Sequence, residues 1–260
     1  MRAIGITAAF LVMAVHSGAA HLTPSADQEF ARYIAGVETR LANQHTSLET
    51  YLATSRSLQL TSGSVQIEPV NGGIRSLGGA LLHHWRAAAF IPNSTPKDML
   101  ALLRNYSNFP RIYAPEVVSS RAVKDDGDTT TLAMRLKEQR LVTVVLDAEY
   151  QVESHLNGDR GYSLSRSTHI WQIDDPGSSR ERKHKEGDDD GYLWRLNSYW
   201  SFAKAVDGSG LSIECEAVSL TRDVPIGLGW LLNPLIQRLP REMLELTLKS
   251  TRNALKEAHR

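Results

Sequence analysis

Two adjacent stretches near the C-terminus decide the fold: residues 211–220, LSIECEAVSL, and residues 223–260, DVPIGLGWLLNPLIQRLPREMLELTLKSTRNALKEAHR. The first alternates apolar and polar residues, as a half-buried β-strand does. The second is helical in pattern and too apolar for a helix on a surface, so it needs a concave apolar partner. The strands before it are the available partner. These stretches predict a curved antiparallel sheet around a long C-terminal helix, with a pocket for an apolar molecule between them.

Three prolines interrupt the C-terminal segment, at positions 225, 234 and 240. Proline removes a backbone donor and clashes with the preceding turn inside a helix. The sequence therefore predicts a short helix that ends before Pro240 and a longer helix from about Arg241 to Ala258.

Earlier segments supply the other predicted strands. Turn signals separate them: KDDGD at 124–128, NGDRG at 157–161 and DGSG at 207–210 are typical of hairpins. A helix is predicted from Pro96, because proline and then Asp98 suit a first helical turn. The predicted strands are Leu81–Phe90, Val117–Val123, Thr129–Leu136, Leu141–Val152, Tyr162–Ile173, Tyr192–Phe202 and Leu211–Leu220.

A charged excursion, from Asp174 to Gly191, separates two of these strands. It contains RERKHK at 180–185 and DDD at 188–190. Such a mixture of charges with glycine is typical of a solvated loop. The sequence predicts a mobile hairpin tip that contributes little to stability.

The N-terminal residues indicate export. Arg2 is followed by an apolar run at 3–15 and by small residues that end at Ala20, which together are typical of a signal peptide at 1–20 with cleavage before His21. The apolar run is shorter than the roughly 20 residues that a membrane span needs, so the mature form is predicted to have no stable span. A periplasmic or secreted location is expected.

The rest of the chain is divided into two parts. Residues 21–76 are predicted to form an N-terminal helical extension and linker, with a helix to about Asn43. The segment from Thr61 to Gly79 is rich in serine and glycine, which is typical of a linker or a poorly paired strand. Residues 77–260 are predicted to form the ligand-binding domain.

Composition excludes several classes of function. Lys+Arg and Asp+Glu both total 29, so the chain lacks the net basic charge typical of nucleic-acid binding. Cys215 is the only cysteine, which excludes an intramolecular disulfide and favours a small core residue. The histidines are dispersed and no nucleotide-binding motif is present, so neither a metal site nor a cofactor is predicted.

Three stretches carry a resemblance to a known family: residues 85–104, the turn NYSNFP at 105–110, and LWRLNSYW at 193–200 followed by residues 214–225. They resemble the START-like superfamily, also called SRPBCC, which includes polyketide cyclases and coenzyme Q-binding START proteins. The resemblance covers roughly Leu81 to Ala258. It implies an α+β helix-grip fold, in which a curved antiparallel sheet surrounds a long C-terminal helix.

The leading interpretation is a binding protein for a hydrophobic small molecule or lipid, with the ligand between the sheet and the C-terminal helix. A cyclase or aromatase-type enzyme that uses the same cavity is one alternative, and a protein-interaction domain is another. This fold hosts binders and enzymes alike.

Aromatic residues supply the candidate site. Strand alternation predicts Tyr192, Trp194, Ser198 and Trp200 on one face, and it places Arg195 on the other. Mid-strand arginines are predicted to face outward and to pair with outward carboxylates such as those of residues 214 and 216. Ordinary core packing is the alternative for each aromatic residue. The predicted ligand-binding residues are Trp171, Tyr192, Trp194, Ser198, Trp200, Leu231 and Leu235.

Overall fold

The computed structural model describes residues 20–53, 64–139, 143–223 and 229–258, with side chains of the last segment described from residue 238. Within these residues one nine-stranded antiparallel sheet forms in the order β2-β3-β11-β10-β7-β6-β5-β4, and β8 pairs with β7. A separate pair joins β1 to β9. The strands are β1 (Ala20–His21), β2 (Val65–Leu77), β3 (Ala80–Pro92), β4 (Val117–Asp125), β5 (Thr129–Glu138), β6 (Val144–Asn157), β7 (Arg160–Asp174), β8 (Arg182–Lys183), β9 (Asp188–Asp189), β10 (Arg195–Lys204) and β11 (Gly210–Arg222).

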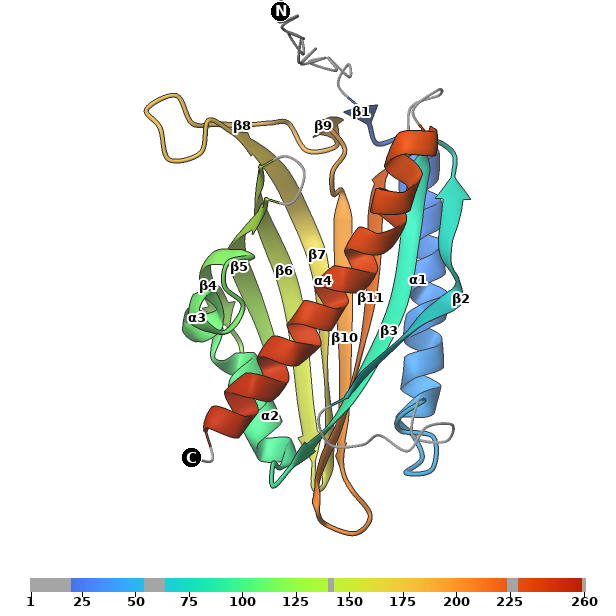
Figure 1. Cartoon of the computed structure of the whole chain (residues 1–260), viewed down its shortest axis with the longest axis vertical. Coiled ribbons are helices and arrows are strands. Elements are labelled where there is room, and N and C mark those ends of the chain that lie inside the picture. Colours follow the sequence, from blue (N-terminus) through green and yellow to red (C-terminus); the bar gives the residue numbers. More distant parts are fainter. Residues whose placement is uncertain (1–19, 54–63, 140–142, 224–228, 259–260) are drawn as a thin grey trace, which may run out of the picture.

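The sheet curves around one long helix, which confirms the predicted architecture. Helix α4 (Gly229–Glu257) crosses the sheet diagonally, as Figure 1 shows in red. Its apolar stripe is buried against β3 and β11 through Leu244, Leu248 and Leu255. The remaining helices are α1 (Pro24–Gln44), α2 (Pro96–Arg104), the 3-10 turn η2 (Tyr106–Asn108) and α3 (Phe109–Ile112).

The prediction of two C-terminal helices is wrong. Helix α4 runs from Gly229 to Glu257 without a break at Pro234 or Pro240. The φ angle of proline is itself helical, so one proline removes a single hydrogen bond without forcing the helix to end.

Helix α1 covers the outer face of the sheet and is part of the same packing unit. Its N-cap is Thr23, whose Oγ1 accepts a hydrogen bond from the Ala26 amide at 3.1 Å. The helix buries one stripe of side chains: Ala26, Phe30, Ile34, Val37 and Leu41. They pack against outward side chains of β3, β10 and β11, including Leu82, Tyr199 and Val218.

The boundary predicted at residue 77 does not separate two packing units. The segment predicted as a linker or a poorly paired strand contains β2, which pairs with β3 along most of its length. A break in register between Pro69 and Ile74 interrupts the alternation of apolar residues, and Asn71, Gly72 and Gly73 adopt positive φ there. This bulge obscures the strand in the sequence.

The excursion at 174–191 contains short strands, ion pairs and one buried carboxylate, which a wholly solvated loop would lack. Its residues form β8 and β9, and Glu181 pairs with Arg135 at 2.8 Å. Asp189 is only 2% exposed and accepts hydrogen bonds from the Trp194 indole and the Gly191 amide. Some of the charges that indicate a solvated loop are thus bound to other strands, whereas Arg180 and Arg182 pair within the excursion and remain largely exposed.

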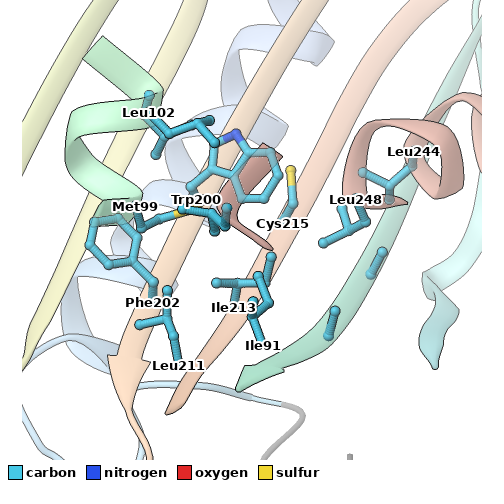
Figure 2. Packing of buried hydrophobic residues seen from close by; sticks show 14 residues of the cluster. Ile91, Met99, Leu102, Trp200, Phe202, Leu211, Ile213, Cys215, Leu244 and Leu248 are labelled. Carbon is cyan, nitrogen blue, oxygen red and sulfur yellow. The ribbon is translucent and has the colours of Figure 1, made fainter. Parts of the chain in front are cut away.

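Apolar side chains pack on both faces of the sheet. The cluster on the concave face lies between α2, α4 and strands β3, β10 and β11. Figure 2 shows Trp200 and Phe202 beside Met99, with Leu244 and Leu248 of α4 on the other side of Cys215. This cluster closes one end of the space between the sheet and α4.

Candidate functional site

A cavity of about 410 Å³ lies between the concave face of the sheet and α4. Helix α4 provides one wall through Leu239, Met243, Leu244 and Leu246. A second wall comes from aromatic residues of η2, α3 and the residue that follows, with apolar residues of β5 and β6. These residues are Tyr106, Phe109, Tyr113, Leu132, Met134, Leu136, Val144, Leu146 and Val152.

The floor of the cavity is formed by inward residues of neighbouring strands. Strand register places Ser165 of β7 opposite Ser198 of β10, and Ser198 opposite Ala217 of β11. Ala217 in turn pairs with Trp85 of β3. These four residues form one row across the sheet, and all of them line the cavity.

The fold is decided by one arrangement: an antiparallel sheet curves around a single long C-terminal helix, and a cavity lies between them. The chain has the START-like helix-grip fold. The aromatic residues of η2 and α3 line the cavity together with the helix.

Comparisons with known proteins found similar solved structures at low identity. No family model and no curated protein matches the chain. A STAR-related lipid transfer protein from Xanthomonas axonopodis is similar in structure, with a TM-score of 0.45 and 17% identity over 71% of this chain and 99% of that one. The lipid transfer and protein localization domain of human StarD13 has a TM-score of 0.47 and 12% identity over 76% of this chain and 88% of that one.

An aromatase/cyclase is also among the similar structures. The Zhui aromatase/cyclase from Streptomyces has a TM-score of 0.43 and 12% identity, over 69% of this chain and 96% of that one. At these identities the likeness concerns the fold alone.

Three of the predicted site residues lie at the cavity. Tyr192, Ser198 and Trp200 line it, and Tyr192 is 44% exposed. Leu231 and Leu235 lie in the first turns of α4, and their side chains are outside the described part of the chain.

The prediction that Trp194 shares a face with Trp200 is wrong. Trp194 precedes β10, and its side chain is buried with α1 on the outer face. Its indole donates to Asp189 at 3.0 Å. Side chains alternate regularly between the two faces of the sheet only from Arg195 onward, where β10 begins. The face on which a preceding residue such as Trp194 lies therefore does not follow from its spacing to Trp200.

Trp171 also lies outside the cavity. A register break opposite Glu149 and Tyr150 inserts an extra residue into β7, and it reverses which residues face inward. Ile170 consequently points into the core, while Trp171 stacks on His169 and lies under the Lys183 ammonium, 3.9 Å from the ring centroid.

Several lining residues were not among those predicted. Tyr106 and Phe109 belong to the turn at 105–110 on which the family resemblance partly rests, and that turn is the signal that points to them; Tyr113 follows three residues after it. The contribution of Met243 and Leu246 depends on how α4 is rotated, and helical spacing alone does not specify this rotation.

The mid-strand arginines face away from the cavity, as predicted, and are paired. Arg135 binds Asp147 of the adjacent strand at 2.7 Å. Arg166 binds Glu38, and Arg195 binds Asp27, so two of these pairs reach across to α1.

Glu216 is the centre of a buried ionic cluster under α1. Its side chain is 1% exposed and accepts hydrogen bonds from His84 and Arg86, each at 2.8 Å, and from Arg40 of α1. Burial by itself raises the pKa of Glu216, but the hydrogen bond from His84 and the charges of Arg86 and Arg40 outweigh it and lower the pKa to about 2.

His83 lies on the concave side of β3, beside the cavity wall. Its Nε2 is 3.1 Å from Oγ1 of Thr221, a residue that lines the cavity. Burial lowers the pKa of His83 to about 4, so the imidazole is neutral near pH 7.

The described residues contain no group of three side chains placed to hold a metal ion. Among the helices in the described part of the chain, none is both long and apolar enough to cross a membrane.

Proposed function

We propose that the chain binds a hydrophobic small molecule or lipid in the cavity between the sheet and α4. The observation that carries this proposal is the cavity itself: about 410 Å³ of space whose walls are apolar and aromatic. Its polar side chains are a minority: serine and threonine residues on the floor and on α4, and charged residues at the margin. Sites for small ligands combine apolar walls with a few fixed polar groups in this way.

Burial of apolar ligand surface would supply the affinity. Each Å² of apolar area removed from water contributes about 25 cal/mol, before the costs of association are subtracted. The packed cluster that contains Trp200 and Leu248 joins the sheet to α4 beside the cavity, and these contacts do not depend on a ligand.

Filling the cavity tests the proposal. Ala217 lies in the middle of the floor, and Ala217→Leu adds three carbon atoms to the space that a ligand needs. We expect the affinity for the neutral probe N-phenyl-1-naphthylamine to fall at least about tenfold, which corresponds to about 1.4 kcal/mol. The fluorescence of the probe reports binding, and calorimetry should show a negative heat-capacity change for the unchanged chain.

Ala133→Leu is the matched control. Ala133 lies on β5 between Leu132 and Met134, which line the cavity, and so it faces the opposite side of the sheet. This variant should bind the probe as the unchanged chain does. Equal affinity of both variants, or no binding by the unchanged chain, would exclude the cavity as a binding site.

We also propose that the protein is exported. The apolar run at 3–15 followed by small residues supports it. Cleavage before His21 would keep the pairing of His21 with Asp188 and the hydrogen bond from the Leu22 amide to Gly187. Mass spectrometry of the protein from its natural host should find His21 as the N-terminus, and an intact Met1 form in the cytoplasm would contradict this proposal.

A further inference from the structure

Three serine hydroxyls on the cavity floor have no hydrogen-bond partner among the described residues. They belong to Ser165, Ser198 and Ser219, one on each of three adjacent strands. Ser163 shows the contrast, since its hydroxyl is bonded to Ser154 at 2.9 Å. The floor therefore presents three free hydroxyls within a largely apolar space.

Strand register gives these hydroxyls a defined spacing. Ser165 and Ser198 are directly opposite each other on neighbouring strands. Ser219 is two residues beyond Ala217, the partner of Ser198, and so lies diagonally from Ser198. The Cβ atoms of directly opposite residues on neighbouring strands are about 5 Å apart, and diagonal neighbours are about 7–8 Å apart. Oxygen atoms along one side of a ligand can reach more than one of these positions.

A ligand that covers these hydroxyls must replace the hydrogen bonds that water gives them. A pure hydrocarbon cannot do so, and the loss of those bonds opposes its binding. A hydroxyl or carbonyl oxygen directed at the floor restores them. The serines thus favour ligands with oxygen on the side that faces β7, β10 and β11.

The charges around the cavity indicate that this oxygen belongs to a neutral group. The charged side chains among the described lining residues are those of Glu116, Lys137 and Glu138, at the margin where β4 begins and β5 ends. On the strands of the floor, Arg166 and Arg195 face outward and are bound to carboxylates. An isolated carboxylate at the floor would be desolvated without a cation to pair with.

We propose that the ligand is a neutral hydrophobe with hydroxyl or carbonyl oxygens along one side, held by the hydroxyls of Ser165, Ser198 and Ser219. This inference rests on the proposed function. It deepens that function by distinguishing neutral oxygenated ligands from fatty-acid carboxylates and from plain hydrocarbons.

A matched series of ten-carbon probes tests the proposal: decane, methyl decanoate and decanoate, each competing with N-phenyl-1-naphthylamine at pH 7. The triple variant Ser165→Ala, Ser198→Ala, Ser219→Ala should bind methyl decanoate about fivefold to tenfold more weakly than the unchanged chain. Its affinity for decane should be unchanged or higher. Ser212→Ala, on the outward face of β11, should change neither affinity.

The outcomes separate this inference from the proposed function. If the naphthylamine probe binds but the triple variant loses no affinity for methyl decanoate, the serines do not recognise the ligand and the inference fails alone. The same holds if decanoate binds more tightly than its methyl ester and Lys137→Met abolishes that preference, because recognition would then lie at the charged margin. If no probe binds the unchanged chain, the proposed function itself fails. Equal thermal midpoints for the triple variant and Ser212→Ala establish that the floor remains folded.

Discussion

A chain that ends after Leu239 should no longer unfold cooperatively. The deletion removes Leu244, Leu248 and Leu255, all of them at most 4% exposed, together with the buried Thr251. Each fully buried leucine contributes about 1.5–3 kcal/mol, and a whole domain is stable by only about 5–15 kcal/mol. The deletion also opens the concave face to water. Calorimetry and near-ultraviolet circular dichroism should therefore show a broad transition without fixed tertiary packing.

Two single substitutions on α4 calibrate this result. Leu248 is fully buried, so Leu248→Ala should lower the free energy of unfolding by about 3–5 kcal/mol. Lys249 is half-exposed and pairs with Glu245 four residues earlier, so Lys249→Ala should cost about 0.5 kcal/mol or less. A sharp transition at the original temperature in the truncated chain would mean that the helix contributes nothing to stability.

Replacing Glu216 with alanine should lower the free energy of unfolding by about 3–5 kcal/mol. The change leaves the largely buried Arg86 without the buried carboxylate that accepts two of its hydrogen bonds, and it removes the partner of Arg40 on α1. Removal of one member of a buried ion pair costs this much because the remaining charge stays desolvated. Chemical denaturation at pH 7 measures the loss.

Glu68→Ala is the matched control, because Glu68 binds the same arginine at 2.8 Å but is 44% exposed. Ion pairs in contact with solvent contribute about 0–1 kcal/mol, so its loss should be small. Equal losses from both substitutions would show that burial of Glu216 under α1 does not set the strength of the cluster.

Glu216 also makes stability depend on pH. Its pKa of about 2 lies below the ordinary value of 4.5, so the unfolded chain binds the proton more readily. The stabilisation is therefore complete above pH 4.5 and is lost as the pH falls from 4.5 to 2. Glu216→Gln should flatten this part of the stability profile, and a slope equal to that of the unchanged chain would contradict the assignment.

Local pattern was sufficient to predict most elements of the sheet. The alternation in LSIECEAVSL predicts β11, and turn signals such as NGDRG at 157–161 predict the hairpins. These features are read correctly because strand period and turn chemistry depend only on residues close in the sequence. The apolar C-terminal segment likewise requires a concave partner whatever the details of packing.

The same distinction between local pattern and strand pairing applies to the candidate site. The inward positions of Ser198 and Trp200 follow from alternation within β10. The outward positions of Trp171 and Trp194 do not, because a bulge in β7 and the late start of β10 each change the parity of a few residues. A shift of one residue moves a side chain to the opposite face, and it depends on pairing with a neighbouring strand.

The sequence by itself determined that a long apolar helix lies within a curved antiparallel sheet, because periodicity and apolar content are local properties of the chain. Only the tertiary structure decided which side chains face the cavity and which charges are buried. Glu216 alternates with apolar residues as a surface carboxylate would, yet its partner Arg40 lies 176 positions away on α1. Packing of α1 on the sheet removes Glu216 and Arg40 from much of the surrounding water. Contacts between residues so far apart in the chain cannot be predicted from the local sequence pattern.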